Sequence, residues 1–263
     1  MGVEGVPTIC RFGKKLKIEH LVGEWFKVPA SESLSMCYIS NCTDAAIFLL
    51  GVAADQVVIR SCENCRIVIA ACLGSIHIEN SKSSAITCAA RSIQIFKSSN
   101  CFLYTFCLRP VEVDSRCSRL IFGPFNAFFS QQKELVERHS DLFPQELENP
   151  INFVVEGGHN SCSVLDPDDF VLYPIPFEKY APSAFLIPSA YQQGLERRQA
   201  RLLEVQNMIK TSSAHEPSRR AIQSELEHHF KVWLRDSGEH IFIDLLSKPM
   251  FEAKLQTVSC SSK

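Results

Sequence analysis

The stretch MCYISNCTDA at residues 36–45 decides the fold, because related stretches return four more times along the chain. They read QVVIRSCENC at 56–65, SIHIENSKSS at 75–84, SIQIFKSSNC at 92–101 and PVEVDSRCSR at 110–119. Each copy has one apolar anchor, and the steps between anchors are 20, 19, 17 and 18 residues; the anchors are Ile39, Ile59, Ile78, Ile95 and Val113. Such a period is typical of a repeat protein, in which each unit buries its apolar side against its neighbours.

Two further positions are apolar in every repeat. The position two residues before the anchor is occupied by Cys37, Val57, Ile76, Ile93 and Val111. The position eight residues after the anchor is occupied by Ile47, Ile67, Ile86, Leu103 and Ile121. The residue just before the anchor varies, so apolar and variable positions alternate as they do in a β-strand. Runs rich in Ser, Asn, Asp and Cys lie between the two apolar positions and indicate tight corners.

These patterns predict an all-β core with a helical tail. The core is expected to be a right-handed parallel β-helix of about five coils, stacked about 4.8 Å apart and joined by backbone hydrogen bonds. An irregular strap and an αα-hairpin follow it. A leucine-rich horseshoe has a similar period, but its Leu-rich consensus and Asn ladder are missing here.

We expect four parts along the chain. Residues 1–35 form an amino-terminal cap over the open end of the β-helix, in which Trp25 fills the cap. Residues 36–130 form the β-helix itself. Residues 131–187 form a proline-rich, irregular strap packed on the β-helix, with a brief helix near 131–139. Residues 188–263 form the helical hairpin and tail.

The hairpin prediction depends on a change of period in the last third of the chain. A first helix is expected to open at Pro188-Ser189, with one apolar stripe made of Tyr191, Leu195, Leu202, Val205 and Ile209. A second helix is expected from near Pro217 to Gly238, with Ile222, Leu226, Phe230 and Trp233 on one side. Two such helices form an αα-hairpin, which packs on the β-helix or offers a surface to a partner.

Composition excludes several classes of function. A formal net charge of -2 and a pI near 6.5 give no reason to expect nucleic acid as the principal partner. The sequence has no uninterrupted apolar window of about 18 residues that would predict a membrane span. It also shows no apolar run of the signal-peptide kind, so we expect a cytoplasmic protein with reduced thiols.

The 12 cysteines therefore need an explanation other than disulfides. Cys62-x-x-Cys65 has the spacing of zinc ligands, but no second pair completes a tetrahedral site. Cys42 and Cys62 occupy the same place in successive repeats, and so do Cys65 and Cys101, as small apolar fillers of a coil would. The Glu225-Leu-Glu-His-His run also suggests metal, but charges on the outer side of a helix are the simpler explanation. We predict no metal and no cofactor.

Several motifs resemble those of one known family. The coil repeats, the Asn64-Cys65-Arg66 corner, Arg109-Pro110 and the closing Phe122-Gly-Pro-Phe are similar to the C-CAP/cofactor C-like (TBCC) domain family. The later motifs resemble the tail of TBCC-domain-containing proteins of centrosomes and basal bodies; they are Asn149-Pro150, Ile175-Pro-Phe-Glu178, Pro188-Ser-Ala-Tyr-Gln192 and Lys231-Val-Trp-Leu-Arg-Asp-Ser-Gly238. The resemblance implies a β-helix with protein partners, tubulin or an Arl-type GTPase among them, at the centrosome, basal body or flagellar base.

The resemblance also implies where an active site would lie. Catalytic family members stimulate GTP hydrolysis with an arginine four residues after a cysteine, and such an arginine stabilises charge on the transferring phosphoryl group. The matching run here is Cys88-Ala-Ala-Arg-Ser, which places Ser92 at the arginine position. We therefore expect a non-catalytic scaffold whose partner-binding residues are His77, Arg91, Ser92, Gln94 and Arg109. Two alternatives stay open: a GTPase-activating protein that uses Arg91 or Arg109, and a tubulin-folding cofactor.

Overall fold

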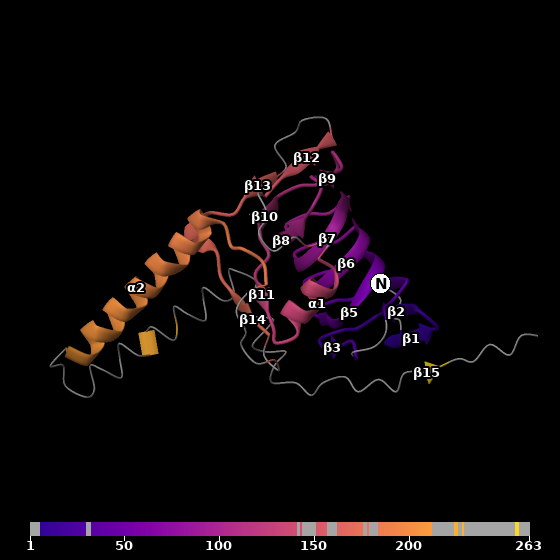
Figure 1. Ribbon diagram of the computed structural model, residues 1–263, viewed down its shortest axis with the longest axis horizontal. Helices are drawn as coiled ribbons and strands as arrows, with labels where there is room; N and C mark the ends of the chain where they lie inside the picture. The colour runs from indigo at the N-terminus through magenta and orange to yellow at the C-terminus, as the bar shows by residue number, and fades with distance from the viewer. Residues whose placement is uncertain are drawn as a thin grey trace, which may run out of the picture.

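The computed structural model shows a parallel β-solenoid with a covering layer on one side and a projecting helix (Figure 1). It describes residues 6–29, 33–140, 143, 151–156, 162–175, 178, 184–211, 224, 225, 228, 256 and 257. The coils are built from β2 (Lys15–Glu19), β3 (Trp25–Lys27), β4 (Met36–Ser40), β5 (Ala46–Arg60), β6 (Arg66–Glu79), β7 (Ala85–Phe96), β8 (Phe102–Cys107), β9 (Val111–Val113) and β10 (Leu120–Pro124).

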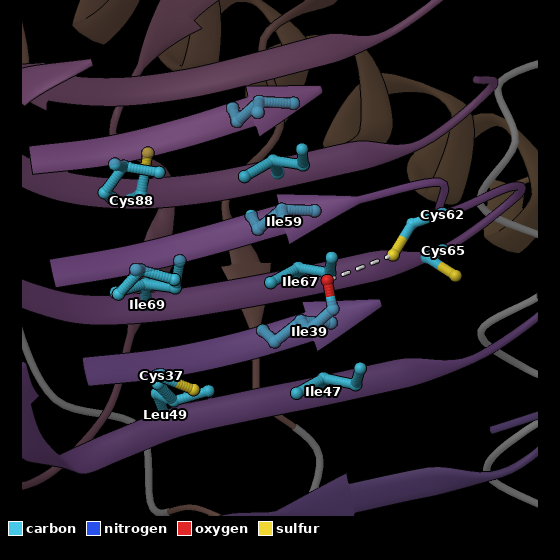
Figure 2. Close-up of a cluster of buried hydrophobic side chains, with 14 of the residues drawn as sticks. Cys37, Ile39, Ile47, Leu49, Ile59, Cys62, Cys65, Ile67, Ile69 and Cys88 are labelled. Carbon is cyan, nitrogen blue, oxygen red and sulfur yellow. Dashed lines mark hydrogen bonds between the residues drawn. The ribbon is translucent and has the colours of Figure 1, made fainter. Parts of the chain in front are cut away.

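Strand pairing confirms the predicted repeat. Parallel pairing places the anchors directly over one another, in the order Ile18, Ile39, Ile59, Ile78, Ile95 and Val113. The position two residues earlier stacks in the same way, from Leu16 through Cys37 to Ile93. Figure 2 shows these side chains filling the interior of the coils, one above another. Because each strand pairs only with its neighbouring coils, the apolar columns form one continuous core.

One column continues differently from the prediction. Phe122, and not Ile121, pairs with Leu103 and is fully buried, whereas Ile121 pairs with Phe102 on the outer side. The reason is one extra residue in the corner after Val113, where the Cys117 amide donates to the Asp114 carbonyl. An insertion of one residue reverses which side chains of the next strand point inward.

The corners explain why Asn, Asp and Ser recur between the strands. Each of the first five corners holds two residues with positive φ, three positions apart, and the enlarged last corner holds one, all in the left-handed region that Asn and Asp tolerate better than most residues. The first position is held by His20, Asn41, Ser61, Asn80 and Lys97, and the second by Gly23, Asp44, Asn64, Ser83, Asn100 and Arg119. Their side chains also bond between coils, as where Asn64 Nδ2 donates to Asp44 Oδ1 at 2.5 Å.

The amino-terminal segment adds a coil to the stack. Strand β2 pairs in parallel with β4, and β3 pairs in parallel with β5, so the solenoid has about six turns. Strand β1 (Thr8–Phe12) then runs antiparallel to β2 at the end of the stack, and β15 (Gln256–Thr257) pairs with β1. Because β1 pairs with β2, it covers the backbone edge that the first coil would otherwise expose.

Residues after the last coil cover one side of the solenoid. They include β11 (Ala127–Phe128), α1 (Gln132–Arg138), the short 3-10 helix η2 (Pro167–Asp169) and β14 (Tyr173–Pro174), whereas β12 (Phe153–Val155) and β13 (Cys162–Val164) pair in parallel with β9 and β10 and extend the stack. Phe185 stacks on Phe106 of β8, with ring centroids 4.4 Å apart. The buried Asn126 side chain accepts from Thr87 Oγ1 at 2.8 Å and donates to the Val171 carbonyl at 3.1 Å. This side of the solenoid, formed by β3, β8, β10 and the earlier parts of β5, β6 and β7, is called the covered face.

Helix α2 (Ser189–Thr211) packs only through its first turns. Tyr191 Oη donates to the Leu165 carbonyl at 2.8 Å, and a Cβ on Gly194 would lie 2.1 Å from the Pro167 carbonyl oxygen. Farther along, Leu202 is 58% exposed, so the predicted apolar stripe does not pack as one unit. Figure 1 shows the helix pointing away from the coils. The second helix of the expected hairpin lies outside the described residues, and no helix in the described part is long and apolar enough to cross a membrane.

Candidate functional site

Among the residues that the structure describes, no layer covers the opposite side of the solenoid, and we call this side the open face. It consists of the outward side chains of β2, β4 and β9 and of the later parts of β5, β6 and β7. Strand register fixes its central column, which runs through Lys17, Tyr38, Val58, His77, Gln94, Glu112 and Val154. These residues are the variable positions that precede each anchor. A flat, solvent-facing sheet of this kind provides a surface for a protein partner.

Three of the five predicted partner-binding residues lie together on the open face. His77 and Gln94 are register partners on adjacent strands, and Ser92 pairs with Ser75 beside them. The His77 ring nitrogen Nε2 lies 3.3 Å from Ser75 Oγ, and Gln94 Nε2 donates to Glu112 Oε2 at 2.6 Å. All three predicted side chains are partly exposed. The structure therefore places Ser92, which the resemblance predicts to stand at the family's arginine position, on the exposed side of the sheet.

Arg91 and Arg109 lie at the corner that borders the open face. Arg91 faces a bulge, because Leu73 and Gly74 stand opposite this single residue between two register pairs. Its carbonyl accepts a long hydrogen bond from the Cys107 thiol at 3.8 Å. Both arginines are exposed, and within the described part of the chain neither guanidinium forms a hydrogen bond or an ion pair. The two cations therefore lie at the edge of the face, and Arg91 immediately precedes Ser92.

Charge is distributed unevenly along the open face. At the middle, Arg60 donates from Nε and Nη2 to the same oxygen of Glu79, at 2.9 and 2.6 Å. At the β2 end, burial alone would raise the pKa of Glu19, but hydrogen bonds from Lys17 and Ser40 outweigh it and lower this pKa. At the far end, Glu112 and Glu156 add negative charge. The face is therefore basic where the solenoid begins and acidic where it ends.

Asp114 is the carboxylate at the acidic end that hydrogen bonds hold most firmly. Its side chain is 4% exposed and accepts from Arg116 Nε at 2.8 Å. A further bond comes from the Arg116 backbone amide at 3.0 Å. These hydrogen bonds lower the pKa of Asp114 to about 2. The ion pair thus stabilises the enlarged corner after Val113.

The cysteine pair that suggested zinc lies inside the solenoid. Cys62 and Cys65 each donate to backbone carbonyls of their corner, Cys62 to Arg60 at 3.5 Å and Cys65 to Glu63 at 3.3 Å. Figure 2 shows a longer contact of the Cys62 thiol with the Ile39 carbonyl, at 3.9 Å. The hydrogen bond with Cys42 lowers the pKa of the Cys62 thiol, but the Cys65 thiol and burial outweigh it and raise this pKa to about 12, so the thiol stays protonated. Ser81 occupies the Cys62 position one coil later and makes the same kind of bond. The Glu225 run lies largely outside the described residues.

Sequence reasoning missed a basic cluster at the beginning of the solenoid. Lys14 and Lys15 form the turn between β1 and β2, and the C-terminal end of α1 brings Arg138 and His139 to the same place. The run Lys14-Lys-Leu-Lys was available as a signal, but it predicts only a strand. Its approach to Arg138, more than a hundred residues away, follows from how α1 packs on the coils.

Comparison with known proteins agrees with this architecture. The family model described as tubulin binding cofactor C matches residues 35–150. TBCC domain-containing protein 1 of Danio rerio is 26% identical over 219 residues, which cover 80% of this chain and 37% of the relative. The Xenopus tropicalis protein of the same name is 24% identical over 218 residues, covering 80% and 39%, and the Homo sapiens protein is 22% identical over 221 residues, covering 82% and 40%.

The chain thus spans about 40% of the length of the curated relatives it matches, and the match extends past the solenoid into the covering segments and the tail. The stacked repeats, the corner motifs and the family model all coincide over the same part of the molecule. Over residues 35–150 the chain is therefore similar to the tubulin binding cofactor C domain.

Proposed function

We propose that this protein is a non-catalytic interaction protein that binds a cytoskeletal partner through the open face. The observation that supports the proposal is the open face itself: no described residue covers it, while the opposite side is buried under α1 and the strap. In such a sheet the apolar residues point inward, and the polar residues form an exposed column that can contact a partner. His77, Ser92 and Gln94 would contact the partner, with Arg91 and Arg109 at the border.

The absence of catalysis is part of the proposal. An arginine supplied to a GTPase stabilises transition-state charge and accelerates hydrolysis by about 10³- to 10⁵-fold. Ser92 carries no charge, and its hydroxyl cannot reach as far as a guanidinium. Arg91 lies opposite the bulge of β6 at the corner, so it has no register partner there as a residue of the regular strand would. We infer that the open face binds a partner but lacks the arginine that would stabilise the transition state of hydrolysis.

Tubulin is the partner class that the family description names, and we propose it, or an Arl-type GTPase, as the ligand of this face. The resemblance to centrosomal and basal-body proteins leads us to propose the same cellular setting for this cytoplasmic chain. The relatives are longer, so their remaining segments could add partners that this chain alone does not bind.

The test uses the purified full chain with tubulin and with Arl-type GTPases. Binding is measured by co-sedimentation with microtubules and by interferometry with each GTPase, for the wild type and for Gln94→Lys. The matched control is Gln193→Lys, which makes the same change at an exposed position of α2. We expect Gln94→Lys to weaken binding at least about tenfold and Gln193→Lys to leave it unchanged. Equal effects of both substitutions would contradict a role for the open face.

The enzyme alternative makes a different prediction, because Arg91 and Arg109 are exposed and lack ion-pair partners in the described part of the chain. Single-turnover GTP hydrolysis should be unchanged by the wild-type chain if the protein is non-catalytic. A stimulation that disappears in Arg91→Ala or Arg109→Ala would replace our proposal with a GTPase-activating protein. Co-purification with tubulin folding intermediates would instead favour a folding cofactor.

A further inference from the structure

The turn between β1 and β2 projects two lysines between two pockets of different character. Lys14 and Lys15 follow Gly13, whose positive φ of 57° closes the turn. The Lys14 carbonyl accepts from the amide of Ser35 at 2.8 Å, so the turn is held against the next coil. Both lysine side chains are exposed. The turn is therefore a fixed feature of the surface that presents its charge in a defined place.

The first pocket is apolar and lies at the basic end of the open face. It has a volume of about 200 Å³ and is lined by Phe12, Lys15, Leu16, Lys17 and Tyr38. Phe12 is 47% exposed and Tyr38 is 38% exposed, so two aromatic rings border it. A volume below the usual range for small-molecule sites suits a single apolar side chain. The lysines on its rim would attract negative charge next to that side chain.

The second pocket is basic and lies on the other side of the same turn. It has a volume of about 350 Å³ and is lined by Lys14, Ser33, Gly51, Ala53, Leu135, Arg138 and His139. Leu135 is buried and anchors α1 against the coils, which fixes the two following basic residues. The pocket therefore combines two permanent cations, an imidazole and a hydroxyl, the groups that bind carboxylates and phosphates.

Neighbouring carboxylates do not cancel this charge. Glu19 pairs with Lys17 at 2.6 Å, on the rim of the apolar pocket. Glu137 on α1 lies 3.7 Å from Lys133. Among the described residues, none of Lys14, Lys15 or Arg138 forms an ion pair. The chain as a whole has a formal charge of -2, so a local cluster of positive side chains indicates that Lys14, Lys15 and Arg138 have a function of their own.

We propose that the two pockets together bind an acidic linear peptide that carries one large apolar residue. The apolar side chain fills the pocket between Phe12 and Tyr38, and the carboxylates that flank it contact the Lys14–Lys15 turn and Arg138. A peptide in an extended conformation suits the arrangement. Its successive side chains point to opposite sides of its backbone, so different residues of the peptide can reach the pockets on the two sides of the turn. This site lies beside the partner-binding residues of the open face and does not depend on them.

The test measures fluorescence anisotropy of a fluorescein-labelled peptide, EEEEFGEE, with the full chain. The peptides EEEEAGEE and KKKKFGKK serve as controls for the anchor and for the charge. The double variant Lys14→Glu/Arg138→Glu removes the basic pocket, and Tyr38→Ala opens the apolar one. The matched double variant Lys82→Glu/Lys133→Glu changes net charge equally at two exposed lysines elsewhere. Far-UV circular dichroism melts establish that every variant is folded.

We expect Lys14→Glu/Arg138→Glu to weaken binding of EEEEFGEE by about tenfold or more, and the matched double variant by less than about twofold. Replacing the peptide's Phe with Ala, or Tyr38 with Ala, should each weaken binding about fivefold. Equal weakening by both double variants would show attraction to net charge alone and would overturn the site. Absence of binding by EEEEFGEE at about 50 mM salt would overturn it too. Either failure leaves the open-face proposal intact, because that proposal is tested at Gln94.

Discussion

Replacement of individual cysteines by serine provides a direct test of how the interior of the solenoid is filled. Cys62 lies in a corner and donates to the Arg60 carbonyl at 3.5 Å. One coil later, Ser81 occupies this position and donates to the Glu79 carbonyl at 3.3 Å. Cys37 lies instead in the aliphatic column, fully buried over Val57. The two cysteines are equally buried but differ in whether a hydroxyl would find an acceptor.

The expected magnitudes follow from that difference. A serine at position 62 makes the bond that Ser81 already makes, so we expect Cys62→Ser to lower the free energy of unfolding by less than about 1 kcal/mol. A serine at position 37 buries a hydroxyl among aliphatic side chains, and among the described residues the Cys37 thiol makes no hydrogen bond that it could inherit. An unsatisfied buried hydroxyl costs about 1–3 kcal/mol. Cys37→Ser should therefore be the more destabilising substitution by about 2 kcal/mol.

The assay is urea unfolding followed by far-UV circular dichroism, with zinc-free buffer and a reducing agent. Because stacked coils can unfold in more than one step, midpoints should be compared only where the slopes of the transitions agree. A loss for Cys62→Ser as large as that for Cys37→Ser would refute the explanation by hydrogen bonding. Zinc released from the wild type but not from Cys62→Ser would refute it as well, since the thiol would then be a ligand.

Two other substitutions test contacts outside the coils. Asn126→Ala leaves the buried Thr87 hydroxyl without its acceptor, so we expect a loss of about 2–4 kcal/mol in the free energy of unfolding by urea, against no change for Gln193→Ala on the exposed side of α2. Asp114 has a folded-state pKa lowered from 3.8 to about 2, so its contribution to stability is present above pH 3.8 and is lost as pH falls toward 2. Asp114→Asn should remove this part of the acid dependence in unfolding curves, and an unaltered pH profile would contradict it.

Most of the fold could be predicted from the repeat. The period of the anchors determined parallel stacking, because only in-register coils bury Ile39, Ile59 and Ile78 together. The corner composition followed from the same physics, since positions with positive φ favour Asn, Asp and Gly. The Ile121 error arose because apolar residues occupy 120–122 without interruption, so a shift by one leaves the sequence pattern unchanged.

The candidate site was only partly predictable. Alternation within a strand placed His77 and Gln94 on the outer side, and the family pattern drew attention to Ser92. Alternation does not say whether an outer side chain faces solvent or a covering segment. Ala46 and Val68 are also outward residues, yet the strap buries both.

The sequence by itself determined the coil, its inner columns and its corners, because these depend on contacts that repeat at a fixed spacing along the chain. Only the tertiary structure decided which face stays open, through the packing of Phe125, Asn126 and Phe185 on the other one. It also brought Arg138 to the Lys14–Lys15 turn. These contacts join segments that share no period, so no local sequence pattern encodes them. They form only when the strap packs on the coils, and the shape and burial of the whole molecule determine how it packs.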